Sequence, residues 1–293
     1  MSTRTATVLA PVSARAQPNY KQRTRLAEWF KNGVLIAICV ALLFPLGLML
    51  VMSVKDKEQI VYQFFTIQPP FHFENYGVAL RYIAPLTMNS VVMAVGSTVL
   101  TVFVTALAGY AFGRLAFPLK NLLFGILFAK MMLPGIMNLI PSFTLAWQLG
   151  ILDTPLPVIL FCAGTSQPFW VFVMRTFVAQ QPRELFEAMR IDGAHEFQIF
   201  RWLALPLLRP MIALMSINVF VSVWNDYIWP LVTIPTFDKR PLTVGLAYLT
   251  QAHPGDYGML TAGYVLAALP LLILFLLAMR QFIEGLTAGA IKL

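Results

Sequence analysis

Six long runs of apolar residues, separated by shorter polar segments, dominate the pattern along the chain. A helix needs about 20 apolar residues to cross a hydrocarbon layer of roughly 30 Å, and each run reaches that length. The sequence therefore predicts an all-α, polytopic membrane protein with six transmembrane helices. The predicted spans cover residues 33–54, 88–112, 122–147, 156–178, 211–232 and 260–282.

The segment before the first run is rich in Thr, Ala, Arg and Pro and has no apolar periodicity. Such a composition is typical of a flexible extension rather than of a packed domain. The predicted organisation is an N-terminal extension over residues 1–32 and a six-helix membrane domain over residues 33–293. A polar connection at about residues 179–210 interrupts the membrane domain.

The composition supports the same class, because 58% of the residues are hydrophobic and only 12% are charged. Soluble proteins carry about 25% charged residues. The net charge of +8 comes mainly from Lys and Arg in the extension and in the connections 113–121 and 179–210. Positive residues in short connections mark the cytoplasmic side, so both termini are expected there. The charge is thus a sign of topology and lipid contact, and no nucleic-acid partner is expected.

Soluble catalysis is not indicated by the sequence. The histidines His72, His195 and His253 lie in different predicted connections, without the paired spacing that places two zinc ligands on one helix face. The chain also has no Gly-x-x-x-x-Gly-Lys-Ser/Thr loop to hold nucleotide phosphates. We therefore expect a protein that is not an enzyme and has no catalytic or metal-ligating residues.

The connection 179–210 has the pattern of two short helices. Good helix formers follow Pro182, and Gly193 offers the permissive backbone of a helix end. In the second helix the apolar residues Phe197, Phe200, Leu203 and Leu207 recur at helical spacing, while Glu196, Arg201 and Arg209 are expected to face water or a partner. The connection could dock into another protein or lie on the bilayer as an ordinary amphipathic loop.

Three segments carry a family resemblance. Residues 187–194, Glu-Ala-Met-Arg-Ile-Asp-Gly-Ala, followed by Leu-Pro-Leu-Leu-Arg-Pro at 205–210, resemble the EAA loop of bacterial ATP-binding-cassette importer permeases. Met189 stands where the motif has a second alanine, a swap between good helix formers. Trp-Asn-Asp-Tyr-Ile-Trp-Pro-Leu at 224–231 and Gly-Leu-Thr-Ala-Gly-Ala-Ile-Lys at 285–292 are similar to the carbohydrate-uptake branch, in the subunit related to the second permease of maltose-type transporters. The resemblance runs from about residue 33 to the C-terminus.

The resemblance implies the type I ATP-binding-cassette importer permease fold, in the bacterial inner membrane, with a sugar or oligosaccharide as substrate. The implied partners are a second, nonidentical permease, two cytoplasmic ATPases that use ATP and magnesium, and an external, periplasmic solute-binding protein. This chain itself would bind no cofactor. The residues implied to couple the permease to the ATPase are Glu187, Ala188, Asp192 and Gly193. The implied C-terminal ATPase contacts are Gly289, Ala290 and Lys292, unless the tail is only a frayed terminus.

Substrate contacts must come from the spans. In the fifth span, Asn218, Ser222, Asn225 and Trp229 follow helical spacing and form a polar stripe on one face. Lipid would not accommodate such a stripe, so it should face the bundle interior. There it could line the translocation path or form hydrogen bonds with a neighbouring helix.

The third span contains Lys130, and then prolines that predict a kink or an interruption. An intramembrane lysine is costly and is a candidate functional residue, although it could also extend to the cytoplasmic surface. A lysine that faced the path would favour an acidic sugar or a sugar phosphate over a neutral sugar. Another solute on the same architecture, and a stand-alone secondary transporter, remain as alternatives. Gly109 and Gly113, four residues apart, could permit close helix approach.

Overall fold

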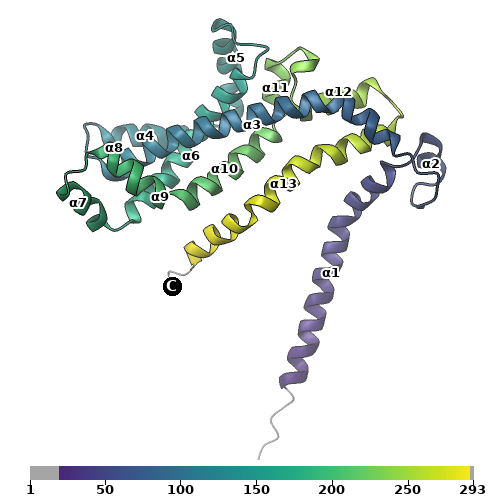
Figure 1. Ribbon diagram of the computed structural model, residues 1–293, viewed down its shortest axis with the longest axis horizontal. Coiled ribbons are helices and arrows are strands. Elements are labelled where there is room, and N and C mark those ends of the chain that lie inside the picture. Colours follow the sequence, from purple (N-terminus) through teal and green to yellow (C-terminus); the bar gives the residue numbers. More distant parts are fainter. Residues whose placement is uncertain (1–19, 291–293) are drawn as a thin grey trace, which may run out of the picture. The chain divides into compact units, whose positions relative to one another are not determined.

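The computed structural model describes residues 20–290, although it leaves out the side chains of residues 20–27, 278 and 280–290 (Figure 1). Within residues 20–290, every regular element is helical and no strand is present, which confirms the predicted all-α class. The chain divides into two compact units, residues 1–48 and 49–293.

The first unit contains most of helix α1, Tyr20–Met52. This helix holds the first predicted span and begins inside the segment predicted to be an extension. Residues 28–47 are exposed, as expected for apolar side chains that face lipid or another subunit. The division at residue 32 between a flexible extension and a membrane domain stays a prediction.

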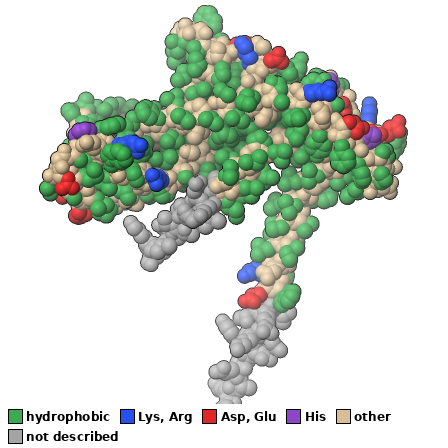
Figure 2. All heavy atoms as spheres, viewed as in Figure 1, with side chains coloured by type: hydrophobic (Ala, Val, Ile, Leu, Met, Phe, Trp, Pro, Cys, Tyr) green, Lys and Arg blue, Asp and Glu red, His purple; other side chains and the backbone are tan. Residues whose placement is uncertain are grey.

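The second unit holds all the other elements. They are α2 Lys57–Tyr62, α3 Glu74–Arg114, α4 Lys120–Lys130, the 3-10 helix η1 Gly135–Asn138, α5 Leu139–Gln148, α6 Leu156–Gln180, α7 Arg183–Ile191, α8 Glu196–Ile199, the π-helix η2 Phe200–Ala204, α9 Leu205–Leu207, α10 Arg209–Trp224, α11 Ile228–Thr233, the 3-10 helix η3 Phe237–Lys239, α12 Leu242–Ala252 and α13 Tyr257–Ala290. Figure 2 shows hydrophobic side chains over the middle of this unit, with charged ones toward its left and right ends and on the part that projects at the top.

The number of membrane spans depends on two bent helix pairs. By length and composition, the described residues contain four helices that could cross a membrane alone, in α1, α3, α6 and α13. The pair of α4 with η1 and α5 is bent by 102°, and the pair of α8 to α9 with α10 is bent by 72°. The count reaches the predicted six if each pair is one span. The predicted interruption of the third span is confirmed, because α4 ends at Lys130 and Pro134 precedes η1.

The second span is longer than predicted. The apolar run starts at residue 88, whereas α3 begins at Glu74 and has 41 residues. At 1.5 Å per residue it is about 60 Å long, twice the thickness of a hydrocarbon layer. Its first turns bury Ala79, Ile83 and Leu86 against α12 and α13. Protein packing rather than lipid supports this part of α3, so hydropathy did not reveal it.

The fifth span was predicted as one helix over residues 211–232, and this is wrong. Helix α10 ends at Trp224, Asn225 caps it, and the chain continues into the separate short helix α11. The backbone N–H of Asn225 donates to the Val221 carbonyl at 3.1 Å. The break is only three residues long, Asn225, Asp226 and Tyr227, and apolar segments flank it, so hydropathy averaged over a whole span did not reveal the end of the helix.

Helices α3 and α6 pack closely, and the predicted role of the small residues in α3 is confirmed. A Cβ atom added at Gly109 would overlap the Cβ of Met174, and one added at Gly113 would lie 2.8 Å from Cγ1 of Val178. Met174 and Val178 are fully buried on α6. The two glycines therefore set the distance between these helices, beside the buried cluster that also includes Tyr110.

Candidate functional site

Helix α7 ends in a Schellman motif built around Gly193. The N–H of Gly193 donates to the carbonyl of Arg190 at 3.1 Å, and the N–H of Ala194 donates to the carbonyl of Met189 at 2.9 Å. Gly193 has φ +84°, the left-handed region that strains residues with a Cβ. Ala194 and Met189 also pack against the buried cluster. The sequence prediction of a helix end at this glycine is confirmed.

The four predicted coupling residues lie together on the exposed side of this helix end. Glu187 and Ala188 are exposed on α7, and Asp192 and Gly193 are exposed directly after it. The opposite side of α7 is anchored by Phe186, which is fully buried. The helix thus presents a short charged surface to its surroundings from a fixed base.

A hydrogen-bond network, part-buried at Tyr110 and exposed at Arg190, fixes the connection to α3. The Tyr110 hydroxyl donates to Oε2 of Glu196 at 2.6 Å, and Nε of Arg190 donates to Oε1 of the same carboxylate at 2.9 Å. The bond to Glu196 raises the pKa of Arg190. One carboxylate therefore joins α3, α7 and α8. Glu196 is exposed as predicted, but it also accepts these two bonds, and nothing in the local spacing pairs it with a tyrosine 86 positions away.

A second contact fixes the start of α7. The guanidinium of Arg114 lies over the ring of Phe186 at 4.1 Å from its centre, and its Nη2 donates to the Gln181 carbonyl. Arg114 is the last residue of α3. Cation–π contacts of partly buried arginines contribute about 0.5–2 kcal/mol. Both ends of α7 are therefore connected to the same end of α3.

Large apolar side chains are exposed on the connection. Ile191 is 86% exposed, Phe197 67% and Trp202 69%. Phe197 was expected on the buried face of the second helix; that expectation is wrong, because the chain switches there from α8 into the π-helix η2 and buries Ile199 and Ala204 instead. Exposed apolar residues among charged ones are typical of a surface that binds another protein.

The predicted C-terminal contacts lie at or beyond the last residue that the structure describes, Ala290. Gly289 and Ala290 are the last two residues of α13, and Lys292 lies outside the described residues. Their proposed contact with an ATPase stays a prediction.

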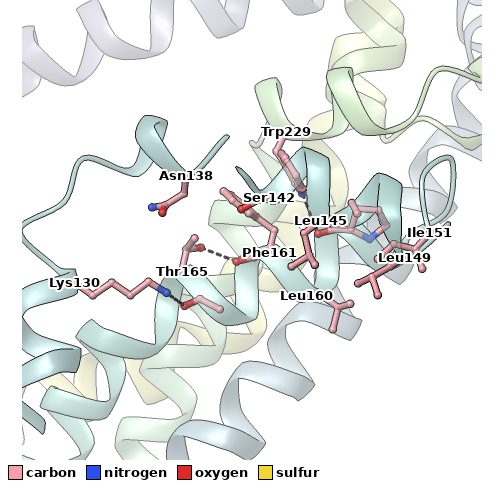
Figure 3. A pocket seen from close by; sticks show the side chains of 13 residues that line it. Lys130, Asn138, Ser142, Leu145, Leu149, Ile151, Leu160, Phe161, Thr165 and Trp229 are labelled. Atoms are coloured by element: carbon pink, nitrogen blue, oxygen red, sulfur yellow. Dashed lines mark hydrogen bonds between the residues drawn. The ribbon is translucent and has the colours of Figure 1, made fainter. Parts of the chain in front are cut away.

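A second candidate site is a cavity of about 190 Å³ among α4, α5, α6 and α11 (Figure 3). Figure 3 shows Lys130, Asn138 and Thr165 at one end, and Leu149, Leu160 and Ile151 at the other. The cavity is thus polar at one end and aliphatic at the other. Its lining residues are Lys130, Asn138, Ser142, Leu145, Ala146, Leu149, Ile151, Pro157, Leu160, Phe161, Gly164, Thr165 and Trp229.

Lys130 replaces a missing backbone donor in α6. Pro168 lies inside that helix and has no N–H, so the carbonyl four residues earlier, on Gly164, loses its helical partner. Nζ of Lys130 donates to this carbonyl at 2.9 Å. The end of α4 is therefore attached to the middle of α6, and the ammonium group lies at the cavity wall.

Trp229 is buried at the other side of the cavity. Its Nε1 donates to the Pro157 carbonyl at 2.9 Å, and its ring stacks on Phe161 with 4.3 Å between centres. Near this helix, Lys239 donates to the carboxylate of Asp153 at 2.7 Å, and this bond lowers the pKa of Asp153. Trp229 is thus held firmly and offers its ring, rather than its N–H, to the cavity.

The predicted polar stripe is only partly present. Asn218 and Ser222 are exposed on α10, and Asn225 is exposed at its end, where Nδ2 donates to the Val221 carbonyl at 2.9 Å. Trp229 does not continue the stripe, because α10 ends before it. The structure brings Trp229 and Lys130 together in the cavity, and the other three residues do not line it.

Comparison with known proteins identifies the class. Residues 106–286 match the family described as "Binding-protein-dependent transport system inner membrane component". The match covers more than half of the chain, and this protein belongs to that family. It is a multi-pass membrane component of a transport system and not an enzyme.

Named transport permeases are similar to most of the chain. The chain is 30% identical over 272 residues to the lactose transport system permease protein LacG of Rhizobium radiobacter, covering 92% of this chain and 98% of that one. It is 32% identical over 258 residues to the arabinooligosaccharides transport system permease protein AraQ of Bacillus subtilis, covering 85% and 90%. The sn-glycerol-3-phosphate transport system permease protein UgpE of Pectobacterium atrosepticum is 30% identical over 278 residues, covering 90% and 98%.

A solved structure shares the fold. This is a chain of a bacterial ATP-binding-cassette transporter involved in the import of the acidic polysaccharide alginate, with a TM-score of 0.79 and 20% sequence identity. The match covers 91% of this chain and all of that one. The type I importer permease fold expected from the sequence is thereby confirmed.

Proposed function

We propose that this chain is one of two nonidentical permease subunits of an ATP-driven importer of sugars or oligosaccharides in a bacterial inner membrane. Relatives at 30–32% identity over most of the chain are named for lactose and arabinooligosaccharides, which supports a carbohydrate substrate. Two cytoplasmic ATPases bind the ATP and magnesium, and a periplasmic protein delivers the solute. This chain binds no cofactor of its own and has both termini in the cytoplasm.

The observation that carries this proposal is the exposed end of α7 on a rigid base. Glu187, Ala188, Asp192 and Gly193 form its outward surface, while the inner side is fixed to α3 through Tyr110 and Phe186. A short helix held in this way moves as a rigid body. ATPase rearrangement would therefore be transmitted to the spans and alternate their access to the two sides.

The pathway is proposed to run along the exposed polar face of α10, with Asn218, Ser222 and Asn225, and past the cavity of Lys130 and Trp229. The second permease would cover these surfaces, because polar groups exposed to hydrocarbon are costly. The chain thereby supplies half of the path. Gly289, Ala290 and Lys292 are proposed as a further ATPase contact.

The test uses the strain at Gly193. Valine at this position is expected to displace the end of α7, because a β-branched residue with φ near +84° is strained. We expect the tagged wild-type chain to co-purify in detergent with a second permease and an ATPase, as identified by mass spectrometry. The Gly193→Val variant should retain the permease and lose most of the ATPase.

A matched control exists at Gly150, which has φ +67° and lies at the end of α5. The same pair of hydrogen bonds occurs there: the N–H of Gly150 donates to the Trp147 carbonyl at 3.0 Å, and the N–H of Ile151 donates to the Ala146 carbonyl at 3.1 Å. Gly150→Val introduces the same strain far from α7 and should keep the ATPase. A wild-type chain that purifies without any ATPase would contradict the proposed function. Equal ATPase loss in both variants would contradict the role of α7.

A further inference from the structure

The ammonium group of Lys130 has no acidic partner in the described part of the chain. The ion pairs found among residues 20–290 do not include it, and within the same range no Asp or Glu lines its cavity. A second hollow of about 230 Å³ lies against the same lysine and shares Asn138 and Thr165 with the first. Its described lining also lacks a carboxylate. Lys130 therefore provides the only formal charge among the side chains that line either hollow within residues 20–290.

The position of the amine argues against simple extension to the membrane surface. Nζ ends on the Gly164 carbonyl, well inside α6, Leu156–Gln180, rather than beyond an end of that helix. A charged lysine inside a membrane costs about 2.5–3.5 kcal/mol on insertion scales. One neutral carbonyl satisfies one of its three donors and leaves the charge unpaired. The remaining two donors and the full charge are available to the cavity.

The rest of the cavity suits part of a sugar. Asn138, Ser142 and Thr165 supply neutral polar groups beside the amine, and Phe161 and Trp229 supply aromatic surface. Complete small-molecule pockets have volumes of about 300–1,000 Å³. A hollow of about 190 Å³ is therefore large enough for only a part of an oligosaccharide, with the rest lying toward the second subunit.

We propose that this cavity binds an anionic sugar unit, whose carboxylate or phosphate pairs with Nζ of Lys130. The inference rests on the proposed transport function and names the substrate class for it. Sequence identity does not decide the matter, because relatives named for lactose and for sn-glycerol-3-phosphate are both 30% identical to this chain. The charge balance of the cavity favours an anionic substrate, because an anion would neutralise Lys130, which no described side chain neutralises.

The experiment measures direct binding to the complete, detergent-purified transporter by saturation-transfer NMR, without the solute-binding protein. The probes are galacturonate, glucose 1-phosphate and glucose, which distinguish a carboxylate, a phosphate and a neutral sugar. We expect one of the two anionic probes to bind the wild type at least about tenfold more tightly than glucose, and we expect Lys130→Gln to abolish this preference. An equal affinity for all three probes, or no binding of either anion, would overturn the proposal.

A second pair of variants separates charge from helix support. Pro168→Ala restores the backbone N–H for the Gly164 carbonyl, so α6 no longer needs the lysine there. Lys130→Gln should therefore lose anion preference in the Pro168→Ala background as well. A double variant that regained the preference would show that Lys130 acts only through the helix, and would overturn the proposal.

Lys120 provides the matched control, because its Nζ also donates to a backbone carbonyl, that of Leu115 at 2.7 Å, but it lines neither hollow. Lys120→Gln should keep the anion preference. If this variant lost the preference equally, the effect would come from net charge and the proposal would fail. A complex that keeps its ATPase and imports maltotriose but shows no anion preference would refute this inference and leave the proposed transport function intact.

Discussion

Replacing Gly109 by valine should prevent α3 and α6 from packing and should strongly reduce the yield of folded protein. A Cβ at this position would overlap the Cβ of Met174, and a backbone carbon of α6 lies 3.3 Å from it. Neither atom is the flexible end of a side chain, so relief requires the helices to separate. Overpacking costs about 1–3 kcal/mol even where side chains can move, and the cost should be higher here.

Separating α3 from α6 should also disturb both candidate sites, because each site includes residues of one of these two helices. Tyr110 follows Gly109 directly and anchors α8, while Gly164 and Phe161 on α6 line the cavity. The measurement is the monodisperse fraction on size-exclusion chromatography in mild detergent, together with the thermal unfolding midpoint.

Gly125→Val is the control for this substitution. Gly125 also lies inside a helix, α4, but no heavy atom comes within 4 Å of a Cβ added there. The control carries the same change in helix propensity and should keep most of the yield. Similar losses in both variants would show that glycine flexibility, rather than close approach, explains the requirement at residue 109.

The sequence predicted the elements that depend on residue type and on neighbouring positions in the chain. Apolar run length predicted the spans in α1, α3, α6 and α13, because crossing lipid depends on the length and composition of a local segment. The end of α7 at Gly193 followed from the backbone freedom of glycine, and Gly109 and Gly113 from their spacing. In each case the residue type itself carries the physical constraint.

The features that sequence reasoning missed depend on contacts between distant residues. The first turns of α3 are stabilised by α12 and α13, and α10 ends just before Asn225 and Asp226, which stand within a mainly apolar stretch. Lys130 was recognised as unusual, but its partner Gly164 follows only from the position of Pro168 on another helix. The link between Tyr110 and Glu196 has no sequence signature, because either residue would be ordinary in its own helix.

Removing the Tyr110 hydroxyl should uncouple ATP hydrolysis from transport. The bond from Tyr110 to Glu196 is a charge-assisted hydrogen bond between α3 and α8, of a kind that contributes about 1.5–3 kcal/mol. Tyr110→Phe keeps the ring contact with Phe200, at 5.4 Å between centres, so the fold should survive. Arg190 would still hold Glu196 to α7, and the exposed coupling surface would remain intact.

Because the docking surface is preserved, we expect ATPase binding and basal ATP hydrolysis near wild-type levels. Solute imported per ATP hydrolysed should fall about tenfold, since 1.4 kcal/mol of lost coupling corresponds to that factor. The assay uses proteoliposomes containing the complete transporter. Glu196→Gln should act in the same direction and more strongly, because it also removes the charge that pairs with Arg190. The double variant should add little to Glu196→Gln, because both changes act on the bond between Tyr110 and Glu196.

Tyr76→Phe serves as the comparison, since it removes a tyrosine hydroxyl that contacts Ser53 Oγ at 2.7 Å, away from the connection to α7. Ser53 retains its bond to the Leu50 carbonyl, so this variant should transport normally. Full coupling in Tyr110→Phe would mean that the buried aromatic cluster alone transmits the motion of α7. Loss of the ATPase itself from Tyr110→Phe would instead mean that the hydroxyl shapes the docking surface, and would contradict a purely transmitting role.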